Sequence, residues 1–286
     1  MSNTITSSLV KKFVPVRKLS SRKGDNGKVL VLGGSYIYHG APALASLAAL
    51  KTGADLVYTC VPKINVQSTR AVSPNLIVIP LVDSKLTRGA VNKLLGQIPN
   101  DLDSATIGMG LSIQDPEALK LLVKSLLDRD VRLSLDASAL VNYILPLLSG
   151  KNVVVTPHAG EFKKMFGEAP PESKKARITM VEKFAKEHSI TILLKGPTDI
   201  ISNGTKTYIN PTNTPGMTVG GTGDILSGII AGMLARNRNA LESAVISAYF
   251  NGLAGKSTQK KLGSHMTATD LLDALPSVMK SFDKIK

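Results

Sequence analysis

The chain has 286 residues, of which 43% are hydrophobic and 4% are aromatic. That length and apolar content are enough for one large hydrophobic core or two small ones. No apolar run approaches the ~20 residues of a membrane-spanning helix, and the first 22 residues are polar and basic, which excludes a secretory signal. The single cysteine, Cys60, excludes an intrachain disulfide and predicts a reducing, cytoplasmic location.

The formal net charge of +14 makes nucleic acid the first partner to consider. Part of this charge lies in a basic N-terminal extension, residues 1–22, ahead of the first expected strand. Because the chain is poor in aromatic residues and has no tryptophan, it offers few side chains on which bases could stack. We therefore favour general solubility, or attraction of anionic nucleotides, over a nucleic-acid function, and we keep a non-enzymatic basic protein that binds nucleotides or nucleic acids as an alternative.

Strand-like and helix-like apolar runs alternate along most of the chain. Strands are predicted at residues 28–33, 56–60, 76–80, 105–108, 132–135, 153–155 and 192–194, a hairpin at 200–209, and helices at 41–51, 119–127, 225–235, 241–255 and 269–279. Apolar strands without strict alternation, interleaved with helices, indicate an α/β fold: a largely parallel central sheet with helices on both faces. Since no linker or repeat divides the chain, we expect a single domain over residues 1–286.

A glycine-rich turn at residues 220–224 runs directly into the apolar stretch at 225–235. Such a turn points free backbone N–H groups at one spot, and the helix dipole adds positive charge there, so the place favours phosphates. Asp224 gains nothing by touching a phosphate, which indicates a base for phosphoryl transfer to a hydroxyl. The structural alternative is that Asp224 caps the helix and the glycines only make a turn.

Polar or glycine-containing segments also follow five of the predicted strands, beginning at Gly33, Gly108, Asp136, Thr156 and Lys195. Each has a structural alternative: Asp136 could cap a helix, and residues 156–162 could be a helix started by a proline. In a parallel sheet, however, all these segments lie at the edge where ligands bind. Their joint position therefore favours a functional site.

Other motifs are rejected. Residues 252–257 are two positions short of the phosphate-loop spacing and lie in a helix-like stretch. Gly33 and Gly34 lack the spacing of a dinucleotide-binding turn. The four histidines and the one cysteine show no metal-ligand spacing, so no protein metal site is identified, and no Ser-His-Asp arrangement is found.

Taken together, these segments resemble the ADP- or ATP-dependent NAD(P)H-hydrate dehydratases of the ribokinase-like superfamily. The resemblance is carried by residues 28–35, 40–42, 108–110, 136–138, 156–162, 195–196 and 217–228, and it extends from about residue 23 to near the C-terminus. Thr156-Pro157-His158 followed by Gly220–Asp224 is specific to this family, whereas Gly-x-Gly-Asp alone is shared by the wider kinase superfamily.

The resemblance implies repair of hydrated (S-form) NADH and NADPH, in which water has added across the nicotinamide ring. ADP or ATP would supply the phosphoryl group, Mg²⁺ would bridge its phosphates with few protein ligands, and the activated hydroxyl would leave as phosphate. The family tends to form homotetramers. Many relatives carry an epimerase domain ahead of this one; the short N-terminus predicts that it is missing here and that any epimerase is a separate partner.

Matched residue by residue, the resemblance makes Asp224 the catalytic acid/base and a hydrate contact, with Ala41, Gly110 and His158 as further hydrate contacts. The nucleotide contacts that it implies are Lys195, Gly196, Pro197, Thr198, Asp199, Gly221, Thr222 and Gly223. Two positions depart from the family. Asn213 stands where a glycine is frequent, so the nucleotide loop loses a flexible residue, and Ala159 stands where a proline is frequent.

The helix dipole is expected to keep Asp224 ionised, ready to take the proton of the hydrate hydroxyl. The N–H groups of Thr222 and Gly223 would stabilise charge on the transferred phosphoryl group. A side chain at Gly223 would block close approach of the phosphate and disfavour any positive φ. The main rival is a kinase of the same fold that phosphorylates a vitamin-precursor alcohol; the segment 156–162 argues against it.

Overall fold

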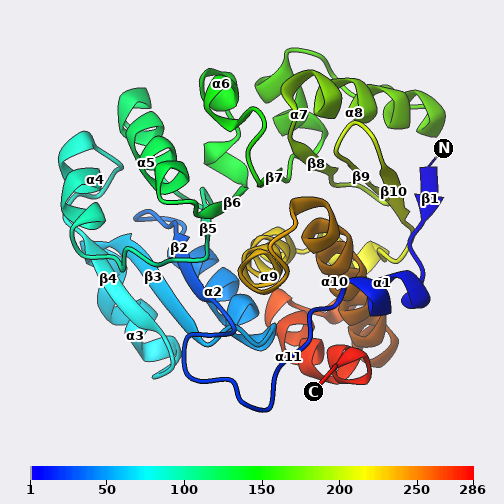
Figure 1. The fold of residues 1–286 in the computed structure, drawn as a ribbon, viewed down its shortest axis with the longest axis horizontal. Helices are drawn as coiled ribbons and strands as arrows, with labels where there is room; N and C mark the ends of the chain where they lie inside the picture. Colours follow the sequence, from blue (N-terminus) through cyan, green and yellow to red (C-terminus); the bar gives the residue numbers. More distant parts are fainter. Residues whose placement is uncertain (1) are drawn as a thin grey trace.

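One ten-stranded sheet spans the computed structural model, which describes residues 2–286 (Figure 1). The strands are β1 (Ser2–Thr4), β2 (Lys28–Leu32), β3 (Leu56–Pro62), β4 (Ile77–Leu81), β5 (Ser104–Ile107), β6 (Arg132–Leu135), β7 (Val153–Val155), β8 (Thr191–Leu194), β9 (Asp199–Ser202) and β10 (Thr207–Asn210). Their order is β1-β10-β9-β8-β7-β6-β5-β2-β3-β4. Only β9 runs against its neighbours, so the predicted largely parallel sheet is confirmed.

Helices cover both faces of this sheet, as predicted. They are α1 (Ser7–Phe13), α2 (Ala41–Lys51), α3 (Val66–Val72), α4 (Arg88–Leu95), α5 (Pro116–Asp128), α6 (Leu145–Leu148), α7 (Ala159–Phe166), α8 (Lys174–His188), α9 (Thr222–Asn237), α10 (Ala240–Leu262) and α11 (Ala268–Met279). In Figure 1, α4 to α8 lie on one side of the strands, and α2, α9, α10 and α11 lie on the other.

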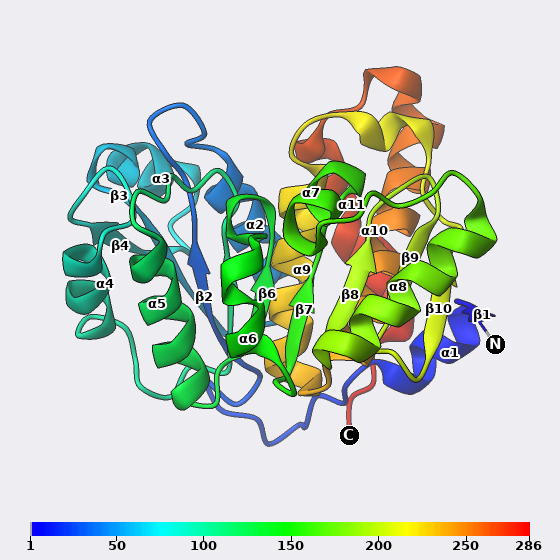
Figure 2. The same ribbon diagram turned by 90° about the horizontal axis from the view of Figure 1, so that it is seen from above.

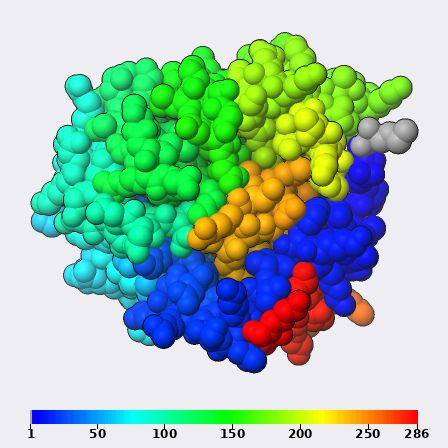
Figure 3. Space-filling model, in the orientation of Figure 1, coloured from blue at the N-terminus to red at the C-terminus, as the bar shows by residue number. Residues whose placement is uncertain are grey.

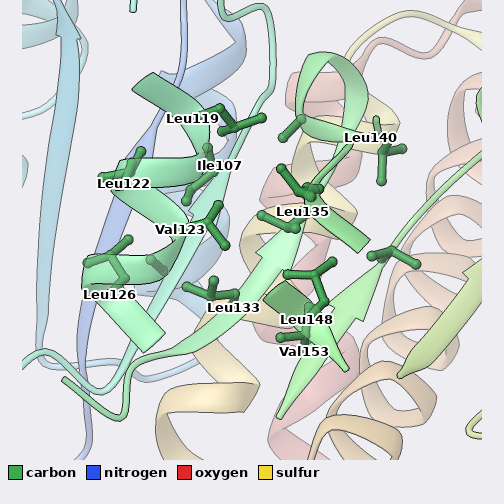
Figure 4. Close-up of a cluster of buried hydrophobic side chains, with 14 of the residues drawn as sticks. Ile107, Leu119, Leu122, Val123, Leu126, Leu133, Leu135, Leu140, Leu148 and Val153 are labelled. Atoms are coloured by element: carbon green, nitrogen blue, oxygen red, sulfur yellow. The ribbon is translucent and has the colours of Figure 1, made fainter. Parts of the chain in front are cut away.

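Helix α5 illustrates how the sequence builds the first of these layers. Asp115 caps its N-terminus by accepting from the N–H of Glu117, and Pro116 starts the helix. Its buried residues recur at helical spacing, from Ala118 to Leu126. Figure 4 shows Leu119, Leu122, Val123 and Leu126 meeting side chains of β5, β6 and β7. Burial of this apolar stripe holds the helix against the sheet.

The opposite layer is centred on α9, which is buried around nearly its whole circumference. Small residues let it approach α2 closely. A Cβ at Gly228 would lie 2.0 Å from the carbonyl oxygen of Ala45, and one at Gly232 would lie 2.0 Å from Oγ1 of Thr52. Only glycine at these two positions therefore permits the close packing of α9 against α2.

The N-terminal segment, predicted as an extension ahead of the first strand, contains a strand and a helix of its own. Residues 2–4 form β1, which pairs in parallel with β10, and Val10 of α1 is fully buried. Arg17 forms a bridge to Ile285 near the C-terminus, and Figure 3 shows the blue N-terminal surface lying against the red C-terminal one. The expectation that the first strand begins at Lys28 was therefore wrong, because β1 is too short and too polar to give an apolar pattern.

Most other predicted elements are found within a few residues of their expected bounds. The hairpin turns at Gly204, whose φ is +84°. Residues 252–257 lie inside α10, which confirms that they are not a phosphate loop. Across residues 2–286, every helix is too short or too polar to cross a bilayer.

Candidate active site

The segments that follow the parallel strands lie together at one edge of the sheet, as expected for this class of fold. Figure 2 shows the loops after β2 and β10 rising at the same end of the molecule, next to the N-termini of α7 and α9. Two hollows open there. The wide cleft, of about 1060 Å³, is lined by the loop after β2, the start of α2 and Asp224. The narrow pocket, of about 700 Å³, is lined by residues after β8 and β10 and by Thr222 and Gly223.

The two hollows meet at the N-terminus of α9. Gly221 is its N-cap and has φ +100°, a left-handed conformation that favours glycine. A Cβ at Gly221 would also lie 2.8 Å from the Cβ of Ala268. Thr222 donates its hydroxyl to the carbonyl of Met217, which ties the helix start to the preceding loop. The first N–H groups of α9 have no partner within the helix and so form a site suited to phosphate.

Gly223 lies within the helix, not in a left-handed turn. Its φ is not positive. The expectation that a side chain would be disfavoured by a positive φ therefore applies to Gly221 and not to Gly223. A Cβ at Gly223 would have Lys195 Nζ as its nearest neighbour, 3.7 Å away. The space in front of this glycine is therefore open to a ligand, and the steric argument for close phosphate approach is retained.

Asp224 lies on the wide-cleft side of the helix start and is half-buried. Burial, with a smaller contribution from the charge of Asp136, raises the pKa of Asp224 to about 7, although Lys195 acts to lower it. The sequence-based expectation that the helix dipole keeps this carboxylate fully ionised omitted this burial, which opposes ionisation near neutral pH. A carboxylate with a pKa near 7 can both take and return a proton at neutral pH.

Lys195 is the cation at the centre of the site. Its Nζ lies 2.8 Å from Oδ1 of Asp136 and 3.6 Å from Oε2 of Glu161. Thr156 donates its hydroxyl to the same Asp136 oxygen at 2.8 Å, which fixes the carboxylate. Burial acts to lower the pKa of Lys195, but the two carboxylates outweigh it and the pKa is raised. The ammonium is therefore held charged, beside Gly223 and the N-terminus of α9.

His158 and Glu161 form the start of α7. The ring Nδ1 of His158 accepts from the N–H of Gly160, and Oε2 of Glu161 accepts from the N–H of His158 at 2.8 Å. This is a capping box, so the structural alternative considered for these residues is present in the fold. Ala159 occupies the first position of α7, a position at which proline is also favoured.

Side-chain hydrogen bonds brace the walls of the narrow pocket. Asn213, which stands where the family frequently has glycine, donates its Nδ2 to the carbonyl of Gly196 at 2.8 Å and so links the segments after β8 and β10. Asp199 accepts from the N–H of Gly196 and from Nδ2 of Asn210. Burial raises the pKa of Asp199 to about 6 despite these bonds.

The predicted contacts distribute between the two hollows as follows. Ala41, Gly110 and Asp224 line the wide cleft, together with Gly221; His158 lines the narrow pocket with Lys195, Gly196, Pro197, Asp199, Thr222 and Gly223. Thr198 lies in the same turn as Pro197 without lining either hollow. The roles of these residues stay predictions. Among the predicted hydrate contacts, only His158 lines the narrow pocket, as most of the predicted nucleotide contacts do.

Sequence reasoning missed several residues of the site. Tyr36 and Tyr38 line the wide cleft from the loop after β2, and these residues are 76% and 63% exposed. Asn251 reaches the narrow pocket from α10. An aromatic pair directly after Gly33 and Gly34 was a usable signal, whereas nothing in the sequence around Asn251 marks it.

Within residues 2–286, no three or more His, Cys, Asp or Glu side chains gather as a metal-binding group. Glu161 and Asp224 nevertheless both line the wide cleft beside the helix start. One or two carboxylates combined with substrate phosphates are the donor set that Mg²⁺ prefers. The residues present therefore fit a Mg²⁺ ion that enters with a nucleotide.

Comparison with known proteins agrees with this geometry. The sequence profile of the NAD(P)H-hydrate dehydratases matches residues 29–277. An ADP-dependent (S)-NAD(P)H-hydrate dehydratase from Nitrosopumilus maritimus is 70% identical over 282 residues, covering 99% of this chain and 98% of its own. The crystal structure of the ADP/ATP-dependent NAD(P)H-hydrate dehydratase from Bacillus subtilis, co-crystallised with ATP and Mg²⁺, has a TM-score of 0.85 at 28% identity, with 99% of each chain covered.

A more distant likeness shows the fold alone. The hydroxyethylthiazole kinase from Pyrococcus horikoshii superposes with a TM-score of 0.61 at 14% identity, over 96% of this chain and 95% of the kinase. The ribokinase-like fold is thus shared with small-molecule kinases, but the profile match and the 70% identity are to dehydratases. The chain belongs to the NAD(P)H-hydrate dehydratase family.

Proposed function

We propose that this chain is a nucleotide-dependent lyase that restores NADH and NADPH from their hydrated (S-form) derivatives. The observation that carries the proposal is the position of Asp224 at the N-terminus of α9, where the two hollows meet. A pocket of about 700 Å³ suits a nucleotide, and a cleft of about 1060 Å³ suits a dinucleotide. In this proposal Asp224 is the base, between a phosphoryl donor in the narrow pocket and an acceptor in the wide cleft.

The chemistry follows from this placement. Asp224 takes the proton of the hydrate hydroxyl while its oxygen attacks the terminal phosphorus of the nucleotide, and the bond from that phosphorus to the bridging oxygen breaks. The N–H groups of Thr222 and Gly223 stabilise the charge on the transferred group. The ring nitrogen then donates its lone pair, the carbon–oxygen bond breaks and phosphate leaves. Loss of a proton from the neighbouring ring carbon restores the reduced nicotinamide.

Lys195 positions the phosphoryl group in this scheme. Its ammonium is held at 2.8 Å by Asp136, next to the open space in front of Gly223. A fixed cation there stabilises charge on the phosphate without reorganisation during the reaction. We propose ADP or ATP as donor, with a Mg²⁺ ion that would be held mainly by the phosphates and by few protein ligands. When bound, the ion supplies neutralisation of phosphate charge.

We further propose that residues 1–286 act as one domain in the cytoplasm, as a homo-oligomer, with a tetramer expected from the family, and with a separate epimerase as partner. Support for an oligomer comes from β4, the last strand of the sheet, where Ile77 is exposed; Val82 directly after the strand is exposed too, as are Ile64 and Val72 nearby in the chain. Support for the cytoplasm comes from the single buried cysteine. Light scattering on the purified chain measures the oligomeric state.

The decisive experiment is incubation with hydrated NADH and either ADP or ATP. We expect the absorbance of reduced nicotinamide to return while inorganic phosphate is released in equal amount. The Asp224→Asn variant provides the matched control. Accumulation of a stable phosphorylated alcohol from a vitamin precursor, with hydrated NADH left unchanged, would identify the chain as a kinase instead.

A further inference from the structure

Asn251 is a buried amide with no structural partner. It lies in the middle of α10, between Phe250 and Gly252, and only 5% of it is exposed. Its Oδ1 makes no hydrogen bond to any group of residues 2–286. The part of Asn251 that is accessible faces the narrow pocket, which it lines.

Such an amide is costly to the fold. A buried polar atom without a partner loses its hydrogen bonds to water and gains nothing in return. Asparagine is also a poor residue for a helix interior. The nearby Asn210 shows the usual solution: it is buried too, but it donates to Asp199 and to the carbonyl of Ala248 and accepts from Thr212. The structure therefore leaves Asn251 available for a ligand.

A second unpartnered polar atom lies in the wall of the same pocket. Oγ1 of Thr214 is buried and makes no hydrogen bond within the described part of the chain, and Thr214 lines the narrow pocket with Asn251. Unpartnered polar atoms are rare in native interiors, so two on the wall of one pocket indicate that a bound molecule completes their bonding.

The surroundings of Asn251 indicate which part of the nucleotide it meets. Phosphates belong at Gly223, at the helix start. Asn251 enters from the wall near residue 212, since Gly252 packs directly on Thr212. Apolar side chains complete this part of the lining: Pro197, Pro215, Met217 and Leu226. Flat apolar surfaces suit a base, and Leu226 lies one helical turn beyond the phosphate-binding residues.

We propose that Asn251 is a specificity-determining residue that hydrogen-bonds the edge of the adenine base. This inference rests on the proposed use of ADP or ATP. Adenine carries an amino donor at N6 beside ring-nitrogen acceptors, and a carboxamide offers an acceptor and a donor side by side, so the two match in a bidentate pair. Rotation of the amide by half a turn decides which of its atoms faces the amino group.

The test pairs a change in the protein with a change in the ligand. Calorimetry measures the Kd of ADP, of purine riboside 5′-diphosphate, which lacks the amino group, and of 2′-deoxy-ADP. We expect the native protein to bind the purine riboside about tenfold more weakly than ADP, as for the loss of one hydrogen bond to a buried group. In Asn251→Leu and Asn251→Ala, ADP should bind about tenfold more weakly and the difference between the two bases should disappear.

Ser243→Ala is the matched control, because Oγ of Ser243 is also buried and unpartnered on α10 but lines neither hollow. It should leave the Kd of ADP unchanged. Equal binding of ADP and purine riboside diphosphate by the native protein overturns the proposal, whether or not the variants fold. So does unchanged ADP affinity in either variant, or a loss of discrimination against 2′-deoxy-ADP, which would place Asn251 at the ribose.

These binding measurements do not depend on turnover. If the native protein fails to dehydrate hydrated NADH but shows the expected pattern of affinities, the proposed function fails and the role of Asn251 stands. If the protein dehydrates hydrated NADH but the expected pattern of affinities is missing, the proposed function stands and the role of Asn251 fails.

Discussion

The narrow pocket and the wide cleft lie on opposite sides of one helix N-terminus and are built differently. Side chains cross-link the narrow pocket: Asn213 holds Gly196, and Gln259 accepts from the N–H of Gly216. The wide cleft is bordered by the loop of residues 35–39, whose aromatic side chains project into solvent.

This difference separates two ways of binding a ligand. Because these hydrogen bonds are present without a ligand, the narrow pocket would have its shape before the proposed nucleotide binds, and little ordering entropy would oppose that binding. In the wide cleft, Tyr36 and Tyr38 are exposed and would lose water contact only when a substrate covers them. A preformed donor site beside a more adaptable acceptor site fits an enzyme in which the phosphoryl donor is small and the acceptor is a large dinucleotide.

The largest effect is expected where the two hollows meet, in Asp224→Asn. The amide keeps the shape of the carboxyl group but cannot accept the proton. The rate of dehydration should fall by about 10²–10⁴-fold, the usual contribution of a general base. Calorimetry should show unchanged ADP affinity. A variant that retains more than a tenth of the native rate would show that another group is the base.

The same variant should be more stable than the native protein. The pKa of Asp224 is raised from 3.8 to about 7 in the folded state, so ionisation opposes folding progressively between these pH values and fully above pH 7. Removing the charge should therefore raise the free energy of unfolding by about 1–3 kcal/mol above pH 7, and by little below pH 4. Urea unfolding at both pH values measures this difference, and equal gains at both would contradict the raised pKa.

The next effect is expected on the narrow-pocket side, in Gly223→Val. The nearest atom to a new Cβ is Lys195 Nζ at 3.7 Å, so the variant should fold. Its side chain would occupy the space in front of the helix N–H groups, and ADP affinity should fall about 100-fold or more, equivalent to roughly 3 kcal/mol. Gly89→Val on the exposed surface of α4 is the control, because a Cβ there meets nothing within 4 Å and Gly89 lines neither hollow. Unchanged ADP affinity in folded Gly223→Val would show that the phosphate does not bind at this site.

The pH profile tests the charges that couple the two hollows. A base must be ionised, so kcat/KM should fall about tenfold per pH unit below pH 7. The charges of Asp136 and Lys195 act on Asp224, and those of Asp136 and Glu161 act on Lys195. Asp136→Asn removes a negative charge that raises the pKa of Asp224, so the midpoint of the profile should move to lower pH. A midpoint that moves upward would show that loosening of Lys195 outweighs the lost charge.

The sequence allowed prediction of the parts of this architecture that local patterns encode. The apolar strands from β2 onward, helix α2 and the glycine-rich start of α9 follow from periodicity and turn residues. The strand β1 did not, because three exposed residues carry no apolar signal. The raised pKa of Asp224 could not be predicted, since it results from burial by distant segments. Asn251 could not be predicted as a site residue for the same reason: a single asparagine in a helix shows no pattern in the sequence, and only the folded structure places it in the wall of the pocket.

The smallest effect is expected at His158, where the sequence and the structure lead to different outcomes. The resemblance predicts a hydrate contact, yet the residue lines the narrow pocket. It also caps α7 through Nδ1, so His158→Ala should lose about 1 kcal/mol of stability. His158→Asn keeps a capping acceptor and should recover that loss of stability. Comparison of the two variants therefore distinguishes the capping role of His158 from its contact with a ligand. From its position we expect both variants to weaken ADP about three- to tenfold, as for one lost hydrogen bond, with the KM for hydrated NADH unchanged. If the KM rises and ADP affinity stays the same, the ring serves the hydrate, and the boundary between the two hollows lies on the nucleotide side of His158.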